Sequence, residues 1–570
     1  MTDAWHASHG PSRLWRGGPW ALELRDDELA DLTFDGRRVL RSIRAVVRDR
    51  DWNTAEWVLE QVASDDSTLE LLLHSDGYGA ELRGTVRVDV SGDLLVVSFD
   101  AVSTTPFETN RTGLVVLHPP QIAGAPLAIT HSDASVEAST FPRSISPHQP
   151  ADDIAGLAWH DDGLEVDVRF TGDVFEMEDQ RNWTDASYKT YSRPLALPFP
   201  YALAAGDRVR QSIAVRVAPL SPPDRVTDRD RLVLAGGGAF PAISVGASTA
   251  PDPAPPLVPI GQALLVELDL AAPNRHAALA RAAASGRPLD VRLVLDPLRP
   301  DALDDLVVRL SGLPVVRLGA FDPHTHVTDR DASAAVRAAA ARAGLDVAIV
   351  GGARSHFTEL NREQDSIADD VDGVVFSVTP LFHSRTTEQL IEAVGMQRLV
   401  AEQAVRIARG TPVHVGPVTL RPRFNNVATV LPAPPPQTDL SLGYGAHFAD
   451  TEDERQDAPQ LAAWTIASAA ALAVPGVASV AYFEEWGPRG VVRADGTERP
   501  AAAALRALAA LSGLPAESAA SPDGLVWAVK GGGTLLLANL DRDDREPTVV
   551  VDGEERTASL PAGGWVSLEV

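Results

Sequence analysis

Strand-like and helix-like segments alternate from about residue 230 to residue 513, and this alternation limits the possible folds more than any other feature. Eight short apolar runs recur there, most of them nearly continuous, as in strands that are buried on both faces. They occupy residues 241–248, 263–270, 289–296, 314–321, 345–352, 373–380, 412–420 and 478–485. Amphipathic segments lie between several of them, at residues 275–285, 302–310, 332–343, 387–409 and 460–474. Eight such strands predict a (β/α)8 barrel, or TIM barrel, with a doubly wound sheet as the structural alternative.

The segments on either side of this region have the pattern of β structure. Residues 1–220 contain short runs in which apolar and polar residues alternate between Gly, Asp and Asn turns, which is typical of a sandwich. A Pro-rich stretch at residues 219–223 follows as a linker. We therefore predict three domains: an N-terminal β-sandwich at residues 1–220, a catalytic TIM barrel at 230–513 and a small C-terminal β domain at 520–570. Three domains also suit a chain of 570 residues, which is too long for one core.

Composition restricts the partners and the location. The chain has 78 acidic and 50 basic side chains, a formal net charge of −28. Such a surface repels phosphate backbones and anionic membranes, so we expect neither nucleic acid nor a membrane as partner. There is no cysteine, which excludes disulfides, thiolate nucleophiles and thiolate metal sites. We find no signal-peptide pattern and no apolar run of membrane-spanning length, so we expect a soluble cytoplasmic protein; a homo-oligomer is left open.

Polar residues follow the fifth to eighth predicted strands, at the ends where TIM barrels place their active sites. Glu359 follows the fifth strand and Glu484 ends the eighth, so the two carboxylates are three strands apart and can point into one cleft. Paired carboxylates in unequal environments can divide into an acid and a base. We predict that Glu359 and Glu484 are catalytic. We expect Glu485 to point away from Glu484, because side chains alternate along a strand.

Other polar residues near these strand ends are candidates for substrate binding. Arg421 and Arg423 follow the seventh strand and could lower the pKa of one glutamate or bind an oxyanion. Residues 175–185 concentrate charges, amides and an indole in one N-terminal loop, which either reaches over the barrel site or forms a hydrogen-bond network between domains. A Pro-rich loop at residues 432–436 is a candidate lid. The predicted substrate-binding residues are Asn361, His383, Arg421, Arg423, Tyr482, Glu178, Asn182 and Trp183.

A metal site is a weaker alternative. Asp322, His324 and His326 follow the fourth predicted strand, and a His-x-His pair can bind zinc. A hydrolytic site would need a further ligand, such as His414 or His383, and the spacing matches no metal motif. The sequence also lacks a Gly-x-Ser-x-Gly nucleophile elbow and a phosphate-binding glycine loop. We therefore expect no metal and no cofactor.

Six stretches of the sequence together form a specific pattern. They are residues 110–113 with 117–119, 141–150, 175–189, 357–362, 417–425 and 482–484. As a set they resemble the D-apionate lactonase family of bacterial sugar-acid catabolism. The resemblance implies an N-terminal β domain, a TIM barrel and a C-terminal β domain, and the hydrolysis of a five-membered sugar-acid lactone to the open acid. The sequence departs from the family pattern at residues 322–326 and 485–486. These departures put the identity of the substrate in question more than the type of reaction.

The sequence thus predicts a hydrolase that opens a sugar-acid lactone similar to D-apionolactone, a small sugar-derived substrate. One of the two glutamates would activate water, the other would protonate the leaving ring oxygen, and Arg421, Arg423 or Asn361 would stabilise the oxyanion. The main alternative is a retaining glycosidase with Glu359 as acid/base and Glu484 as nucleophile. A non-catalytic carbohydrate-binding protein that uses some of the 11 Trp residues is a third hypothesis.

Overall fold

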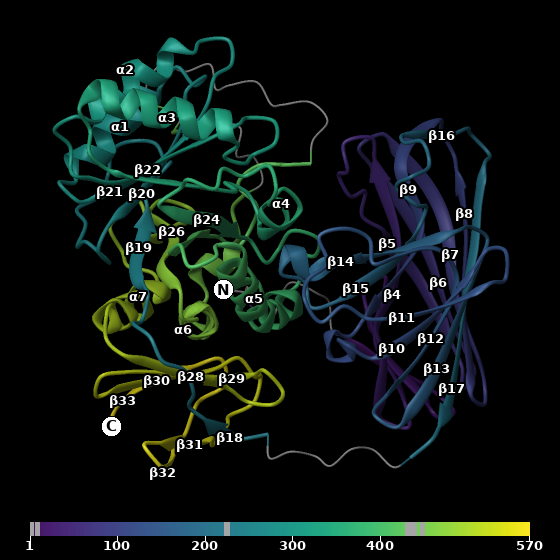
Figure 1. The fold of residues 1–570 in the computed structure, drawn as a ribbon. Helices are drawn as coiled ribbons and strands as arrows, with labels where there is room; N and C mark the ends of the chain where they lie inside the picture. Colours follow the sequence, from purple (N-terminus) through teal and green to yellow (C-terminus); the bar gives the residue numbers. More distant parts are fainter. Residues whose placement is uncertain (1–4, 6–11, 222–228, 428–439, 442, 445–450) are drawn as a thin grey trace.

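Three parts make up the chain in the computed structural model (Figure 1). The structure describes residues 5, 12–221, 229–427, 440, 441, 443, 444 and 451–570. An N-terminal β domain lies beside a barrel of strands and helices, and a small C-terminal β domain packs below the barrel in Figure 1. No helix in the described ranges is long and apolar enough to cross a membrane.

The central part is a closed barrel of eight parallel strands. They are β19 (Ala242–Gly246), β20 (Leu264–Asp269), β21 (Leu289–Val294), β22 (Val315–Phe321), β23 (Ala348–Gly352), β24 (Gly373–Val378), β25 (Val413–Val418) and β26 (Val477–Trp486). Each strand pairs with the next, and β26 pairs in parallel with β19. That last pairing removes the two edge strands that a doubly wound sheet would have. The predicted TIM barrel is therefore confirmed.

Helices surround the barrel close to the predicted positions. They are α1 (Arg275–Ala284), α2 (Asp301–Leu310), α3 (Arg330–Ala343), α4 (Phe357–Arg362), α5 (Thr387–Ile407), α6 (Gln460–Leu472) and α7 (Pro500–Leu511). The residues of α6 from Leu461 onward are all buried, because this helix packs against α5, α7, β29 and β30. An apolar surface on all sides is typical of such a buried helix. The sequence analysis found five of these helices and did not specify α4 or α7.

The barrel interior contains a charged cluster as well as apolar side chains. Asp290 of β21 accepts a hydrogen bond from Arg317 Nε of β22 at 2.9 Å, and it pairs with Arg292. Arg292 also donates to the carbonyl of Gly416 on β25, at 2.6 Å across the barrel. Burial opposes the charge of Asp290, but the two guanidinium groups lower the pKa of its carboxyl to about 2. The cluster therefore joins β21, β22 and β25 through charged groups that are shielded from water.

The N-terminal domain is a β-sandwich whose layers form one continuous sheet. Its strands are β1 (Arg13–Gly17), β2 (Trp20–Arg25), β3 (Glu28–Phe34), β4 (Arg37–Asp49), β5 (Val58–Ser64), β6 (Thr68–Gly77), β7 (Ala80–Ser91), β8 (Leu94–Ser103), β9 (Phe107–His118), β10 (Pro126–His131), β11 (Val136–Thr140), β12 (Ala151–Asp161), β13 (Leu164–Thr171), β14 (Phe175–Asp179), β15 (Tyr188–Ser192), β16 (Tyr201–Leu203) and β17 (Arg208–Pro219). One apolar core lies between the layers. Strands β14 and β15, joined by the 3-10 helix η2 (Gln180–Trp183), extend toward the barrel (Figure 1).

The C-terminal domain consists of two small sheets that share one core. The first contains β28 (Ala516–Ala520), β29 (Val526–Gly531), β30 (Thr534–Asn539) and β33 (Trp565–Glu569); the second contains β18 (Arg231–Val233), β31 (Thr548–Val551) and β32 (Glu554–Thr557). Strand β18 falls within the residues assigned to the barrel from sequence, yet it pairs in parallel with β31. The chain therefore adds a strand to the C-terminal sheet before it enters the barrel, a long-range pairing that no local pattern signals.

The charged cluster predicts the effect of one substitution. In Asp290→Asn the carboxylate that Arg292 and Arg317 share is lost, while Arg292 stays buried and Arg317 half-buried. We expect the free energy of unfolding to fall by about 3–5 kcal/mol in urea titrations. Asp305→Asn, on the exposed surface of α2, is the matched control and should change it by less than about 0.5 kcal/mol. Equal stability of the two variants would contradict a structural role for the cluster.

Candidate active site

The N-terminal domain packs against the barrel at the ends of β23 and β24. Trp183 of η2 stacks on Phe382, which follows β24, with ring centroids 4.3 Å apart and planes inclined by 14°. Asp185 pairs with Nδ1 of His383 at 2.6 Å and accepts a hydrogen bond from Gln389 of α5. Figure 1 shows β14 and α4 where the two domains meet. The carboxyl ends of the barrel strands therefore lie partly beneath the first domain.

Glu359 is held at the start of α4 by hydrogen bonds to both carboxylate oxygens. Ser355 Oγ donates to Oε2 at 2.7 Å, and the backbone N–H of His356 donates to the same atom at 3.2 Å. Asn426, which follows β25, donates to Oε1 at 2.7 Å. With His356 as the N-cap, Glu359 also completes a capping box, which fixes its orientation. Burial raises the pKa of Glu359, while the Ser355 hydrogen bond opposes that shift.

Glu484 lies in a different environment at the end of β26. It forms an ion pair with Arg489 at 2.9 Å and accepts hydrogen bonds from the N–H and the hydroxyl of Thr249, which follows β19. The side chain of Arg489 also donates to the Thr249 hydroxyl. Glu484 therefore has a cation and two further donors. This contrasts with Glu359, whose hydrogen bonds come from the neutral groups of Ser355, His356 and Asn426.

A backbone irregularity decides which way Glu484 points. Phe483 has a φ of 49°, in the left-handed region, and the register between β19 and β26 shifts at this residue. In a regular strand Glu484 would lie on the same side as Tyr482. The shift in register places it on the opposite side. Tyr482 faces α6, where its hydroxyl lies 2.9 Å from Ser468 Oγ, whereas Glu484 meets Thr249 at the strand ends. Tyr482 was predicted to bind substrate, but the structure does not bring it to this face.

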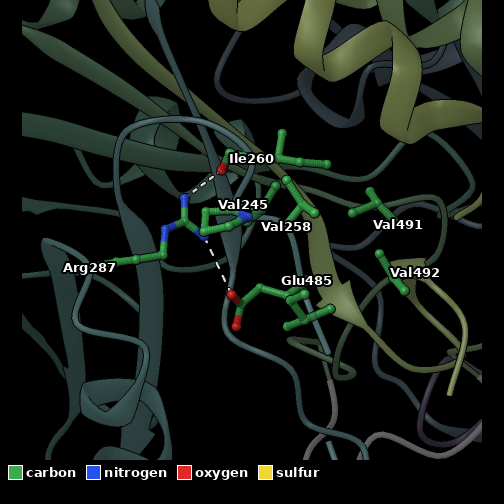
Figure 2. A pocket seen from close by; sticks show the side chains of 9 residues that line it. Val245, Val258, Ile260, Arg287, Glu485, Val491 and Val492 are labelled. Atoms are coloured by element: carbon green, nitrogen blue, oxygen red, sulfur yellow. Dashed lines mark hydrogen bonds and ion pairs between the residues drawn. The ribbon is translucent and has the colours of Figure 1, made fainter. Parts of the chain in front are cut away.

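Glu485 points away from Glu484, in the direction that strand alternation predicts. Figure 2 shows it paired with Arg287, and the Arg287 side chain also donates to the carbonyl of Ile260. The pocket around this pair has mostly apolar walls: Val245, Leu257, Val258, Pro259, Ile260, Val491 and Val492. The residues that line it do not include Thr249, Arg489 or any partner of Glu359. The pocket is therefore separate from the site of the two predicted catalytic glutamates.

A third glutamate lies near the strand ends, and it was not predicted from the sequence. Glu267 of β20 forms ion pairs with Arg354 at 2.8 Å and Arg423 at 2.9 Å. Burial opposes its charge, but these two cations lower the pKa of Glu267 to about 2. Tyr444 lies beside this cluster and accepts a hydrogen bond from the N–H of Asp269. The signal was present, since Glu267 is a charged residue that follows three apolar residues within a strand.

The two arginines after β25 do not have the partners expected for them. Arg423 pairs with Glu267 and donates to the carbonyl of Arg354, and Arg421 pairs with Asp453 at 3.0 Å. The cation beside Glu484 is Arg489, which sequence reasoning did not identify. A loop arginine can reach several carboxylates, and the chain order alone does not say which one it meets.

Several other predicted substrate contacts form the domain interface. Asn361 donates to Asn182 Oδ1 at 2.8 Å and to the carbonyl of Ile145, and it accepts a hydrogen bond from Gln403 at 3.0 Å. The nitrogen and the oxygen of this buried amide therefore both form hydrogen bonds with other protein groups. Glu178 pairs with Lys189 at 2.6 Å and with Arg362 of α4 at 3.1 Å. Of the two possibilities for residues 175–185, the network between domains accounts for these contacts.

The histidines considered as metal ligands have separate partners. His326 Nδ1 lies 3.2 Å from an Arg354 nitrogen, and His414 Nδ1 lies 2.8 Å from Ser479 Oγ inside the barrel. His383 pairs with Asp185 instead. Across the ranges that the structure describes, no three or more His, Cys, Asp or Glu side chains are grouped to hold a metal ion. The candidate lid at residues 432–436 lies outside the described residues.

Comparison with known proteins assigns the family. Residues 1–219 match the family domain described as D-apionate lactonase, N-terminal domain, and residues 258–513 match D-apionate lactonase, TIM barrel domain. The chain belongs to the D-apionate lactonase family. A protein from Brucella anthropi named D-apionate lactonase is 27% identical over 563 residues, with 88% of each chain covered. The resemblance stated from sequence and the prediction of a hydrolase are both confirmed.

Two solved structures illustrate more distant matches to parts of the chain. A glycoside hydrolase family 30 xylanase from Clostridium acetobutylicum is 10% identical, with a TM-score of 0.38 over 59% of this chain and 98% of its own. A putative aldose 1-epimerase from Escherichia coli K12 is 14% identical, with a TM-score of 0.27 over 37% of this chain and 99% of its own. At these scores the likenesses carry no functional argument.

The interface predicts a measurable loss on substitution at Asn361. Asn361→Ala leaves the Asn182 oxygen and a Gln403 donor without this partner in a buried position, which should lower the free energy of unfolding by about 1–3 kcal/mol. Denaturant titration would measure the change. Gln364→Ala is the control, because this exposed amide lies three residues further along the same segment. A loss at Gln364 as large as that at Asn361 would show that the interface is not the cause.

Proposed function

We propose that this protein hydrolyses the lactone of a sugar acid, with D-apionolactone as the first substrate to test, at the ends of the barrel strands. Membership of the D-apionate lactonase family over both the N-terminal domain and the barrel is the observation that carries this proposal. The name of the Brucella anthropi relative suggests the substrate. The unequal environments of Glu359 and Glu484 suit the acid–base chemistry that lactone opening requires.

In the proposed mechanism Glu359 is the acid and Glu484 is the base. The raised pKa of Glu359 favours its protonated form, so Glu359 is assigned the acid, and Glu484, which contacts the Arg489 guanidinium, is assigned the base. Glu484 takes a proton from water as the water oxygen bonds to the lactone carbonyl carbon. Glu359 donates its proton to the ring oxygen as the bond between that oxygen and the carbonyl carbon breaks. Exchange with solvent then restores both glutamates, and the product acid ionises at neutral pH.

The Glu267 cluster is the proposed source of oxyanion stabilisation. Arg354 and Arg423 share the single carboxylate of Glu267, so the three groups together carry a net positive charge. A preorganised cation near the carbonyl oxygen stabilises the negative charge that develops there in the tetrahedral intermediate. Of the other residues considered for this role, Asn361 has its amide engaged at the domain interface and Arg421 pairs with Asp453. Oxyanion stabilisation is therefore assigned to Arg423.

Substitution of the two glutamates tests the proposed roles. Glu359→Gln and Glu484→Gln should each lower kcat for D-apionolactone by roughly 10²–10⁴-fold, since each removes one proton-transfer group. Glu485→Gln is the matched control, because its carboxylate pairs with Arg287 on the other side of the strand, and it should keep nearly full activity. Full activity in either of the first two variants would contradict the assignment. Cleavage of aryl glycosides without lactone opening would support a glycosidase, and loss of activity with a chelator would indicate a metal.

The pH dependence gives a second test of Glu359 as the acid. A general acid must be protonated, so kcat/KM should fall as pH rises through the raised pKa of Glu359. Ser355→Ala removes a hydrogen bond that favours the carboxylate form, so it should raise that pKa further and move the alkaline limb to higher pH. Ser366→Ala, in which an exposed hydroxyl that donates to Glu363 is lost, is the control. An alkaline limb that stays in place in Ser355→Ala would exclude Glu359 as the acid.

A further inference from the structure

Two arginines lie directly opposite each other on neighbouring strands of the N-terminal domain. Arg48 of β4 and Arg111 of β9 are Cα partners in the antiparallel ladder, so their side chains leave the same face of the sheet. Like charges at opposed positions of two strands repel and destabilise the pairing. Figure 1 shows β4 on the side of the N-terminal domain that faces α5. The repulsion between Arg48 and Arg111 therefore lowers the stability of the fold, and stability does not explain why both arginines are present at the domain boundary.

No carboxylate of the described residues forms an ion pair with either arginine. Arg48 donates to the carbonyl of Trp52 at 3.1 Å, and Arg111 donates to the carbonyl of Arg193 at 3.4 Å. Arg111 is only 6% exposed, and its Nε is buried without a hydrogen-bond partner. Backbone carbonyls accept hydrogen bonds but supply no negative charge. Within the described part of the chain, the two positive charges therefore have no direct counter-ion.

Neighbouring side chains add positive charge and aromatic walls. The Arg111 guanidinium lies 3.5 Å from the ring centroid of Tyr191 and 5.3 Å from that of Trp52. Lys189 lies 5.0 Å from the same Tyr191 ring, and its counter-ion, Glu178, is shared with an arginine of α4. Burial and the charge of Arg111 lower the pKa of Arg48 to about 10. These contacts hold the cations in place, while burial makes the charged form of Arg48 less favourable.

A short series of contacts joins this pair to the proposed acid. Asn426 donates to Glu359 at 2.7 Å, and the adjacent Asn425 donates to the carbonyl of Asp51 at 3.4 Å. Asp51 belongs to the turn after β4 that also contains the carbonyl bonded by Arg48. The arginine pair and Glu359 therefore flank the same contact between the N-terminal domain and the loop after β25.

We propose that Arg48 and Arg111 form an oxyanion subsite that binds the carboxylate of a sugar acid. Guanidinium groups match the planar geometry and the charge of a carboxylate, which would cancel the repulsion between the two arginines. A lactone has no carboxylate, so this subsite binds the open acid in preference to the cyclic ester. The choice of a sugar acid rests on the proposed function, in which that acid is the product.

Calorimetric titration with sodium D-apionate at constant ionic strength tests the subsite without turnover. We expect one acid to bind per chain, and Arg48→Gln to weaken binding at least about tenfold, since one charge-assisted contact is lost. Arg50→Gln is the matched control, because this exposed arginine next to β4 pairs with Glu108, and it should bind like the wild type. Equal binding by Arg48→Gln, or no binding by the wild type, would overturn the subsite.

Two further measurements test the geometry and the selectivity of the subsite. Arg111→Lys keeps the charge but loses the planar fork, so it should also weaken binding, and thermal melting would establish that each variant is folded. Inorganic phosphate titrated in parallel should bind more weakly than the sugar acid; tighter binding of phosphate would overturn the carboxylate assignment. Binding of the acid is measured without the lactone. Failure to hydrolyse D-apionolactone would therefore refute the proposed function, and the binding measurement would test the subsite independently.

Discussion

The contact between the η2 loop and the barrel is the interaction on which the candidate site depends. Asn182 and Trp183 meet Asn361 and Phe382, so part of the surroundings of the strand ends comes from another domain. These groups are buried, and their hydrogen bonds are made between protein atoms, which fixes the relative position of the two domains. Thr358 and Asn361 of α4 both donate hydrogen bonds to Asn182, so the first domain holds the helix that carries Glu359. The chemistry proposed for the barrel is therefore a property of the two domains together.

Local patterns were enough to predict the barrel, since strands buried on both faces are nearly continuous apolar runs such as that of β24. They also predicted that Glu485 and Glu484 diverge, because alternation is a local property. The turn of Glu484 toward Thr249, however, depends on a left-handed residue at Phe483, where a side chain normally disfavours that conformation. The parallel pairing of β18 with β31 was missed for a related reason, since it joins segments far apart in the chain.

The identities of charged partners were the least predictable part of the site. Glu267, Arg489 and Asn426 all contact predicted residues, yet each was missed because a side-chain partner is set by the folded chain and not by local sequence. Long flexible side chains can reach any of several strand ends, so their pairing is decided by the three-dimensional arrangement. Residue types at the strand ends thus indicated where the site lies, and the structure was needed to show which groups meet there.

The irregularity at Phe483 has a consequence for how this site can evolve. Two adjacent glutamates lie just after it, one directed to Thr249 and the other to the Arg287 pocket. Glu484, and not Phe483, is the ladder partner of Gly246, so removal of Phe483 would restore regular alternation and leave both carboxylates with their present directions. A single deletion would then still present Glu484 at the strand ends. Descendants of this enzyme can therefore lose the irregularity and retain a carboxylate there.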